Sequence, residues 1–158
     1  MSFRHICQDG AGRKCFLQAG NPNDIRPLLT QLANNARDVE NIGLVIGSVK
    51  GHFALIIEGP QFCFACTDHC RSSPIFYHTR SISNDAHKLR AAKNLNTPNN
   101  KGVRDAAMAG FVTGPHTLFL GLSQLEAGTY ALWHADQAKP LIYKHSVYRP
   151  DKLHSVRD

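Results

Sequence analysis

The sequence predicts a single strand-rich α+β domain built from antiparallel hairpins. First, 158 residues suffice for one domain with a sizeable core, because folding at this length buries roughly 70% of the surface of the unfolded chain. Second, a hydrophobic content of 42% and a charged content of 19% are typical of globular proteins. Third, short apolar segments alternate with turn-forming ones, and neither a repeat nor a low-complexity tract interrupts them. Residues 1–158 are therefore expected to form one domain.

The first part of the chain predicts an extended segment and then a helix. Residues 14–20 (KCFLQAG) alternate weakly in polarity and end at the turn-forming GNPND. Residues 24–36 are expected to be helical, because their apolar positions recur at i, i+3, i+4 and i+7. Asn23 or Asp24 would cap this helix, and Pro27 would lie in its first turn, where a missing N–H costs little.

The middle of the chain predicts a hairpin. Residues 41–49 (NIGLVIGSV) are expected to be buried and extended, with a partly helical form as the alternative. Residues 52–67 predict two strands joined at EGPQ, and residues 75–80 (IFYHTR) predict a further strand. SNDAHKLRAAKN then predicts a helix capped by Ser83 or Asn84.

The last third predicts one more helix and one more strand pair. Residues 94–102 (NLNTPNNKG) are expected to be a loop by composition. Residues 103–112 predict a short helix that ends near Gly110. TYALWH (129–134) and KPLIYKHSVY (139–148) predict two strands joined by a polar turn.

Charge and hydropathy exclude several function classes. The net charge is +6 and the pI is about 9.2, but the only adjacent basic pair is Arg13 and Lys14, so no nucleic-acid binding is expected. No apolar run approaches the roughly 20 residues of a membrane span. The N-terminal segment MSFRHICQDGAGRK contains no apolar signal region. Five cysteines without such a signal predict reduced thiols and a cytoplasmic location.

Residues 62–78 contain three cysteines in a C-x2-C-x3-C arrangement beside two histidines, which invites a zinc interpretation. Phe64 and Ala65, however, favour extended chain between Cys63 and Cys66. Successive side chains of a strand point to opposite faces, so these two thiols are expected to diverge and to act as small core residues. No metal site is therefore expected.

The same stretch resembles a known family. ACTDHCRSSPIFYH is similar to the ARDRxGxxPLYY segment in the glutaminase domain of asparagine synthetase-like proteins, through Asp68, Arg71 or its neighbour, Pro74, Phe76 and Tyr77. Upstream, VKGHFALIIEG resembles the family's LNGxFAFALxD strand, and downstream SISNDAHKL takes the place of ASEIKAL.

The most specific match is GPHTLFLGLSQLEAGTYALWH (114–134), which resembles the family's TLFxGIxxLxPGHYL segment. The matching residues are Thr117, Leu118, Phe119, Gly121, Leu122, Leu125, Gly128 and Tyr130. PLIYKHSVYRP then lies where the family's YWxP tail leaves the domain. The resemblance covers about residues 50–150, with four motifs in order.

This resemblance implies an N-terminal-nucleophile (Ntn) hydrolase-like sandwich of two antiparallel sheets flanked by helices. In the family, this domain releases ammonia from glutamine, and an ATP-pyrophosphatase domain uses the ammonia to amidate an adenylated carboxylate. The SGGxDS nucleotide loop of that second domain is absent from this sequence, so the chain is expected to be a fragment or a free-standing domain. The implied partner is a synthetase domain or protein. Glutamine is a further candidate ligand, a homodimer is an open alternative, and no cofactor is expected in this domain.

The family's nucleophile is a cysteine that becomes residue one, with its own α-amino group as the base. This sequence begins Met1-Ser2-Phe3 where the family begins MCGI. Three interpretations follow. The domain is degenerate and does not hydrolyse amides; or Ser2 acts after removal of Met1; or Cys7 acts after cleavage behind Ile6.

The substrate-binding segments of the family, HRGPD and RLSIID, are not recognisable here. QAGNPNDIRPLL can be aligned in two ways. In one, Ala19 and Gly20 take the place of the NG pair of the oxyanion hole, where losing an amide donor costs about 10²–10³ in rate. In the other, Asp24 takes the place of an aspartate that holds the α-amino group of the substrate. The alternative role of Asp24 is that of an ordinary helix cap.

Two further candidates, Asp68 and Arg71, lie on the expected hairpin turn, where they would form an ion pair or an interdomain contact. Taken together, the residues predict a glutamine amidotransferase-like domain of an asparagine synthetase-type enzyme. It would act as a structural, docking or regulatory domain without glutaminase activity. The alternative is an active Ntn glutaminase that supplies ammonia by means of Ser2 or Cys7.

Overall fold

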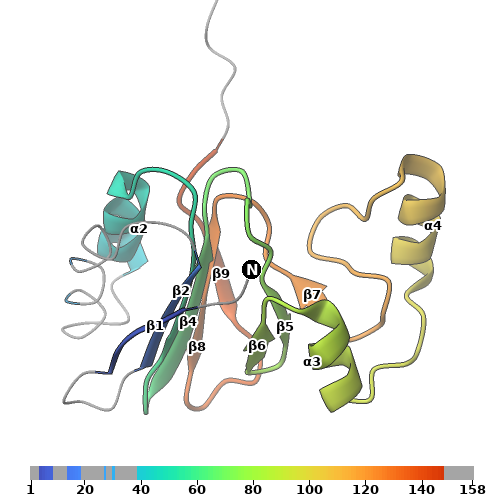
Figure 1. Ribbon diagram of the computed structural model, residues 1–158, viewed down its shortest axis with the longest axis horizontal. Helices are drawn as coiled ribbons and strands as arrows, with labels where there is room; N and C mark the ends of the chain where they lie inside the picture. The colour runs from blue at the N-terminus through green and yellow to red at the C-terminus, as the bar shows by residue number, and fades with distance from the viewer. Residues whose placement is uncertain (1–3, 9–13, 19–26, 28–29, 31–38, 148–158) are drawn as a thin grey trace, which may run out of the picture.

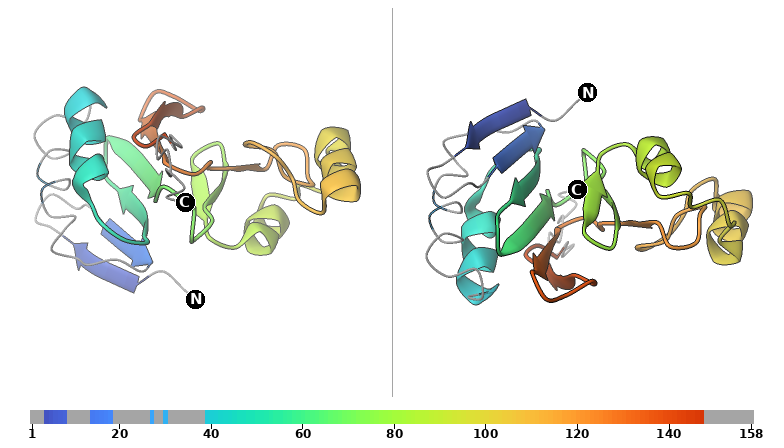
Figure 2. Two further views of the ribbon diagram at one scale, coloured as in Figure 1. Left: turned by 90° about the horizontal axis from the view of Figure 1, so that it is seen from above. Right: turned by 90° about the horizontal axis from the view of Figure 1, so that it is seen from below.

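The structure, a computed structural model, describes residues 4–8, 14–18, 27, 30 and 39–147 (Figure 1). Two antiparallel sheets lie face to face, with helix α2 (Val39–Ser48) outside the larger sheet and helix α3 (Ala86–Ala92) beside the smaller one. Helix α4 (Asn100–Ala109) lies at the end of the molecule opposite α2 (Figure 2). The predicted fold class, a sandwich of two antiparallel sheets with flanking helices, is confirmed.

The larger sheet has six strands in the order β1-β2-β3-β4-β8-β9, and every neighbouring pair is antiparallel. Its strands are β1 (Arg4–Gln8), β2 (Lys14–Gln18), β3 (Ala54–Glu58), β4 (Phe62–Thr67), β8 (Thr129–His134) and β9 (Leu141–Lys144). Strands β3, β4 and β8 are apolar on both faces because both faces are covered by other parts of the chain.

Side chains alternate along β4 between two cores. Phe64 and Cys66 face α2, whereas Cys63 and Ala65 face the smaller sheet. All of β4 is buried. The prediction that Cys63 and Cys66 diverge is therefore confirmed, and the two thiols cannot share a metal ion.

The smaller sheet has the order β6-β5-β7 and packs on the other face of the larger one. Its strands are β5 (Phe76–His78), β6 (Ser81–Ser83) and β7 (Ser123–Gln124). Tyr77 contacts Trp133 edge to face, with ring centroids 5.5 Å apart. Ile75 and Leu125, both fully buried, complete this contact between the sheets.

Two expectations are corrected. Residues 41–49 were expected to be extended, with a partly helical form as the alternative; residues 41–48 belong to helix α2, because Ile42 and Ile46 lie one turn apart and both are buried against the sheet. A continuous apolar run is compatible with either structure, so its pattern alone does not separate them. Helix α3 is capped by Asp85 rather than by Ser83 or Asn84: Asp85 Oδ1 accepts from the Lys88 N–H at 3.0 Å.

Most of the other expected elements are found. The hairpin of residues 52–67, the strands within 75–80, 129–134 and 139–148, and the extended segment at 14–18 are confirmed. The last helix ends at Gly110, as expected, but begins at Asn100, inside the expected loop. Strands β1, β6 and β7 were not expected. The predicted helix 24–36 lies outside the described residues except for positions 27 and 30, both helical. In the part of the chain that the structure describes, no helix has the length and apolarity to cross a bilayer.

Candidate functional site

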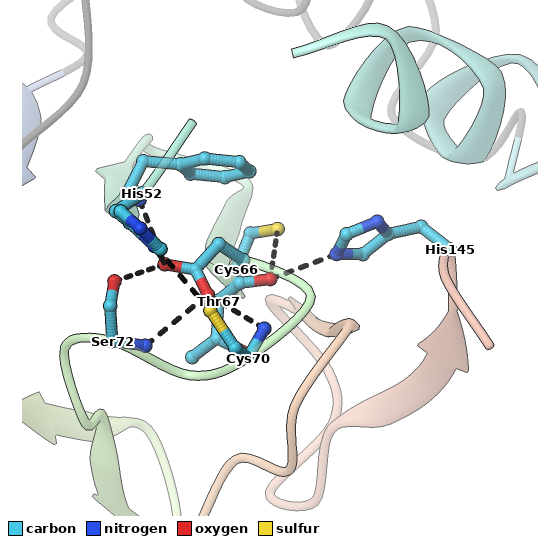
Figure 3. A network of polar contacts seen from close by, with 8 residues as sticks. His52, Cys66, Thr67, Cys70, Ser72 and His145 are labelled. Carbon is cyan, nitrogen blue, oxygen red and sulfur yellow. Dashed lines mark hydrogen bonds and ion pairs between the residues drawn. The ribbon is translucent and has the colours of Figure 1, made fainter. Parts of the chain in front are cut away.

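The loop after β4 is organised by one buried carboxylate, that of Asp68. Figure 3 shows the network of polar contacts to which it belongs, with His52, Cys70 and Ser72 labelled. Its Oδ2 accepts hydrogen bonds from the Phe53 N–H at 2.9 Å and from the Ser72 hydroxyl. Its Oδ1 accepts from the N–H groups of Cys70 at 2.9 Å and Ser72 at 3.2 Å. The side chain therefore joins the residue that precedes β3 to the loop that follows β4.

These hydrogen bonds set the charge of Asp68. Burial alone would raise the pKa of its carboxyl, because it disfavours the ionised form. The Ser72 hydroxyl and the three backbone N–H groups outweigh burial and lower the pKa to about 2. Asp68 is therefore a carboxylate at neutral pH.

Two exposed side chains lie against this carboxylate. The Nδ1 atom of His52 is 3.4 Å from the Sγ atom of Cys70 and 3.9 Å from Asp68 Oδ2. The three ligand atoms all lie within 4.8 Å of one another. We refer to His52, Asp68 and Cys70 as the His52–Asp68–Cys70 cluster.

Sequence reasoning missed this cluster because His52 stands well before the other two residues in the chain. The register of the β3–β4 hairpin could have revealed the cluster. Ala54 pairs with Thr67 and Leu55 with Cys66, so continuing the register places His52 opposite His69, between Asp68 and Cys70. The rings of His52 and His69 are indeed stacked, with centroids 6.1 Å apart.

The geometry does not favour a nucleophilic role for Cys70. Its hydrogen bond with Asp68 raises the pKa of the thiol, so the thiolate is scarce at neutral pH. In a catalytic relay, the nucleophile and the carboxylate use different nitrogens of the histidine. Here both lie near Nδ1 of His52. A thiol, an imidazole and a carboxylate are nevertheless the three side-chain types that ligate zinc.

Cys15, Cys63 and Cys66 are buried. Burial, followed by the nearby charge of Glu58, raises the pKa of the Cys63 thiol to about 12. Burial also raises the pKa of Cys66, and Cys15 is buried in the core against α2. None of these three thiols is accessible for attack on an amide.

The structure leaves most of the predicted catalytic and substrate-binding residues undescribed. Ser2, Gly20 and Asp24 lie outside the described residues. Cys7 lies inside strand β1, where its backbone pairs with that of Cys15. The roles predicted for Ser2, Cys7, Gly20 and Asp24 therefore stay predictions.

Arg71 is placed away from the Asp68 carboxylate. Its backbone has φ 53°, its N–H donates to the Asp68 carbonyl at 3.2 Å, and no ion pair joins the two side chains. Arg71 instead lines a cavity of about 260 Å³ beside α3 and the segment after α4, together with Phe76 and His87. Arg71 was predicted to form either an ion pair with Asp68 or an interdomain contact. The ion pair is not formed, and the interdomain contact stays a prediction.

Apart from Tyr130, which lies in β8, the residues of the segment 114–134 that carry the family resemblance lie in the turns and irregular stretches around β7. The Thr117 hydroxyl donates to the Leu122 carbonyl at 2.9 Å and accepts from the Phe119 N–H at 3.1 Å. Gly128 has φ +64°, and a Cβ atom there would lie 2.6 Å from the Ser146 carbonyl oxygen, so only glycine fits. These residues position strand β8 and offer no reactive group.

No protein-family model matches the chain, and no curated protein sequence matches it. Among solved structures, the chain is similar to the allosteric regulatory enzyme of purine biosynthesis, with 12% identity and a TM-score of 0.46. It is also similar to glutamine phosphoribosylpyrophosphate (PRPP) amidotransferase from B. subtilis, complexed with ADP and GMP, with the same identity and TM-score. The matches cover 89% and 90% of this chain but only 30% and 31% of the two enzymes. The function is therefore argued from the residues of this chain.

Proposed function

We propose that the chain is a class II glutamine amidotransferase-like domain, of Ntn type, from an asparagine synthetase-type enzyme that uses ATP. In this proposal it serves as a structural, docking or regulatory domain and does not hydrolyse glutamine. Its partner is a synthetase domain or protein that takes ammonia or another nucleophile directly. A cytoplasmic location and a homodimer remain predictions.

The proposal rests on the fact that three segments that resemble the family meet at Asp68. In chain order they are VKGHFALIIEG, ACTDHCRSSPIFYH, which contains Asp68 itself, and GPHTLFLGLSQLEAGTYALWH. The first segment contributes Phe53, whose carbonyl accepts from the Asp68 N–H at 3.0 Å and whose N–H donates to the Asp68 carboxylate at 2.9 Å. The third contributes Gly128, whose N–H donates to the Asp68 carbonyl at 2.8 Å. Segments that merely resembled a family by chance would have no reason to meet at their matching residues.

The burial and the raised pKa values of the cysteine thiols support the proposal that the chain does not hydrolyse glutamine. An amide requires a strong nucleophile, and the thiolate is the reactive form of cysteine. Cys63 and Cys66 are buried with raised pKa values, and the pKa of the exposed Cys70 is raised as well. The competing proposal, an active glutaminase, therefore depends on Ser2 or Cys7 as a processed N-terminal residue.

A docking role is supported by apolar side chains that the described chain leaves uncovered near α4. They are Val103, Met108, Phe111, Leu118 and Leu120. Exposed apolar residues that gather in one region typically mark an interaction surface. The synthetase domain is the occupant we propose.

The test is glutamate release from glutamine by the purified chain, after mass spectrometry of its N-terminus. Ser2→Ala and Cys7→Ala variants serve as matched controls. The expected result is no release above the blank from a chain that is folded by circular dichroism. Release that disappears in one of the two variants would identify the nucleophile and replace the proposal by its alternative.

A further inference from the structure

We propose that His52, Asp68 and Cys70 form a binding site for a zinc ion on the loop after β4. The site takes one ligand from each of three chemical classes: the Nδ1 atom of the imidazole, a carboxylate oxygen and the Sγ atom of the thiol. Of the run of three cysteines in residues 62–78, only Cys70 takes part. The proposal departs from the expectation that the chain binds no metal.

The spacing of the three atoms fits a tetrahedral ion. Zinc lies about 2.0–2.3 Å from such ligands, so two ligands of a tetrahedron stand roughly 3.3–3.8 Å apart. The distances from His52 Nδ1 are 3.4 Å to Cys70 Sγ and 3.9 Å to Asp68 Oδ2. Two of the three distances are thus close to those of a tetrahedral site, and the third, between Cys70 and Asp68, is within 4.8 Å.

The ligand set selects the class of metal. Sulfur and imidazole nitrogen favour zinc and other late transition metals, whereas magnesium and calcium prefer sites made of oxygen alone. The Cys70 thiol loses its proton to solvent when its sulfur binds the ion. The fourth position is left to water or to an external ligand, because the side chains of His52 and Cys70 are exposed.

The surroundings of Asp68 suit a metal ligand. Carboxylates that bind metals are commonly oriented by donors behind them. The Phe53 N–H, just before β3, and the N–H groups of Cys70 and Ser72, in the loop after β4, all donate to the carboxylate. Rotation of Ser72 about its Cα–Cβ bond would move the hydroxyl away from Oδ2 and leave a lone pair of that oxygen for the ion.

The contacts also indicate what the ion does. It would connect His52, just before β3, to Asp68 and Cys70, just after β4, and so fasten the open end of the β3–β4 hairpin. A ligand that binds only the folded state stabilises it by mass action. The site therefore predicts a chain whose melting temperature rises with zinc concentration, whether or not glutamine is hydrolysed.

The test uses Co²⁺ as a spectroscopic probe on the full, reduced chain after treatment with a chelator. A thiolate–cobalt charge-transfer band and tetrahedral d–d bands are expected, and Zn²⁺ should abolish them by displacement. Cys70→Ser should lose the charge-transfer band, and His52→Ala should bind Co²⁺ at least about tenfold more weakly. His87→Ala, which removes an exposed histidine on α3, is the control and should bind like the parent chain.

Three results would overturn the site. The parent chain shows no charge-transfer band; Cys70→Ser retains the band, which would assign it to another thiol; or His52→Ala binds as tightly as the His87→Ala control. Both test residues are exposed, so their substitution should leave the fold intact, and circular dichroism checks this. Asp68 is not substituted in this test because it also holds the loop.

Discussion

Strand β4 and helix α4 are held in the molecule in opposite ways. Every residue of β4 is buried; Phe62, Phe64 and Cys66 pack against α2, and Cys63 and Ala65 pack against the smaller sheet. In α4, by contrast, only Gly102 is buried, and Met108 is 82% exposed. Hydrophobic burial positions the strand, whereas caps and one close backbone contact position the helix. Substitutions in the two elements should therefore fail in different ways.

The largest effect is expected for Phe64→Ala. Phe64 is fully buried and packs against Tyr130, with ring centroids 5.8 Å apart. Truncation leaves a cavity in the core against α2 and should lower the free energy of unfolding by about 3–5 kcal/mol. Urea unfolding followed by the fluorescence of Trp133, the only tryptophan, measures it. A loss below about 1 kcal/mol would contradict the conclusion that hydrophobic burial holds β4 in place.

Gly102→Ala should lower the free energy of unfolding less than Phe64→Ala, and its effect should be confined to α4. A Cβ atom at Gly102 would lie 2.1 Å from the Thr117 carbonyl oxygen, so the helix must move away. We expect about 1–3 kcal/mol of destabilisation and faster amide exchange confined to residues 100–109. Gly110→Ala is the control: no atom lies within 4 Å of its Cβ position, although its φ of +77° adds strain. Equal exchange of α4 in both variants would show that the contact with Thr117 does not hold the helix.

The lowered pKa of Asp68 predicts that the folded protein loses stability in acid. Its pKa is about 2 in the folded protein, against about 3.9 in an unfolded chain. Its stabilisation is therefore present above pH 4 and lost as the pH falls towards 2, on the order of 1–2 kcal/mol after solvent screening. Urea unfolding at pH 7 and at pH 2.5, with EDTA present, measures the difference. In Asp68→Asn, the part of the stability loss that comes from protonation of Asp68 should be absent. If the variant loses as much stability in acid as the parent chain, other groups cause the loss.

Asn99→Ala should cost about 1 kcal/mol. The side chain of Asn99 caps α4 by accepting from the N–H groups of Lys101 at 3.2 Å and Gly102 at 3.5 Å. Asp85→Ala, which removes the cap of α3, is the matched comparison. Thermal unfolding by circular dichroism provides the measurement. An Asn99→Ala variant as stable as the parent would leave the contact of Gly102 as the main support of α4.

The smallest effect is expected for Met108→Ser. Because Met108 is 82% exposed, its removal should change the free energy of unfolding by less than about 0.5 kcal/mol. The variant should, however, bind a synthetase partner more weakly if the apolar surface near α4 is the docking site. Unfolding and pull-down experiments on the same variant separate the two effects. A large loss of stability would mean that another part of the chain covers Met108.

The sequence predicted the structure best where a residue pattern was compatible with only one kind of element. Alternation in FCFACT correctly separated Cys63 from Cys66, because a strand buried on both faces still sends neighbouring side chains in opposite directions. The run of residues 41–49 was ambiguous, since a helix against a sheet and a buried strand can both be continuously apolar. Short β6 and β7 carry too few residues for any period to be read.

The candidate site was less accessible to sequence reasoning. Asp68 was recognised from its resemblance to a family motif, but its role as an acceptor for backbone groups depends on the tertiary arrangement. His52 joins Cys70 only through the hairpin register, and a shift of one residue would place it on the other face. Of the two roles expected for Asp68 and Arg71, the ion pair does not form: Arg71 lines the cavity beside α3, whereas the Asp68 carboxylate accepts from Phe53, Cys70 and Ser72.

The divergence of Cys63 and Cys66 supplies the protein with two natural reporter groups. Cys66 is sealed between the larger sheet and α2, and Cys63 between the two sheets. An alkylating reagent can reach the first thiol only when α2 lifts off, and the second only when the sheets separate. Mass spectrometry of the two labelled peptides over time would therefore show which layer opens first, without any engineered probe.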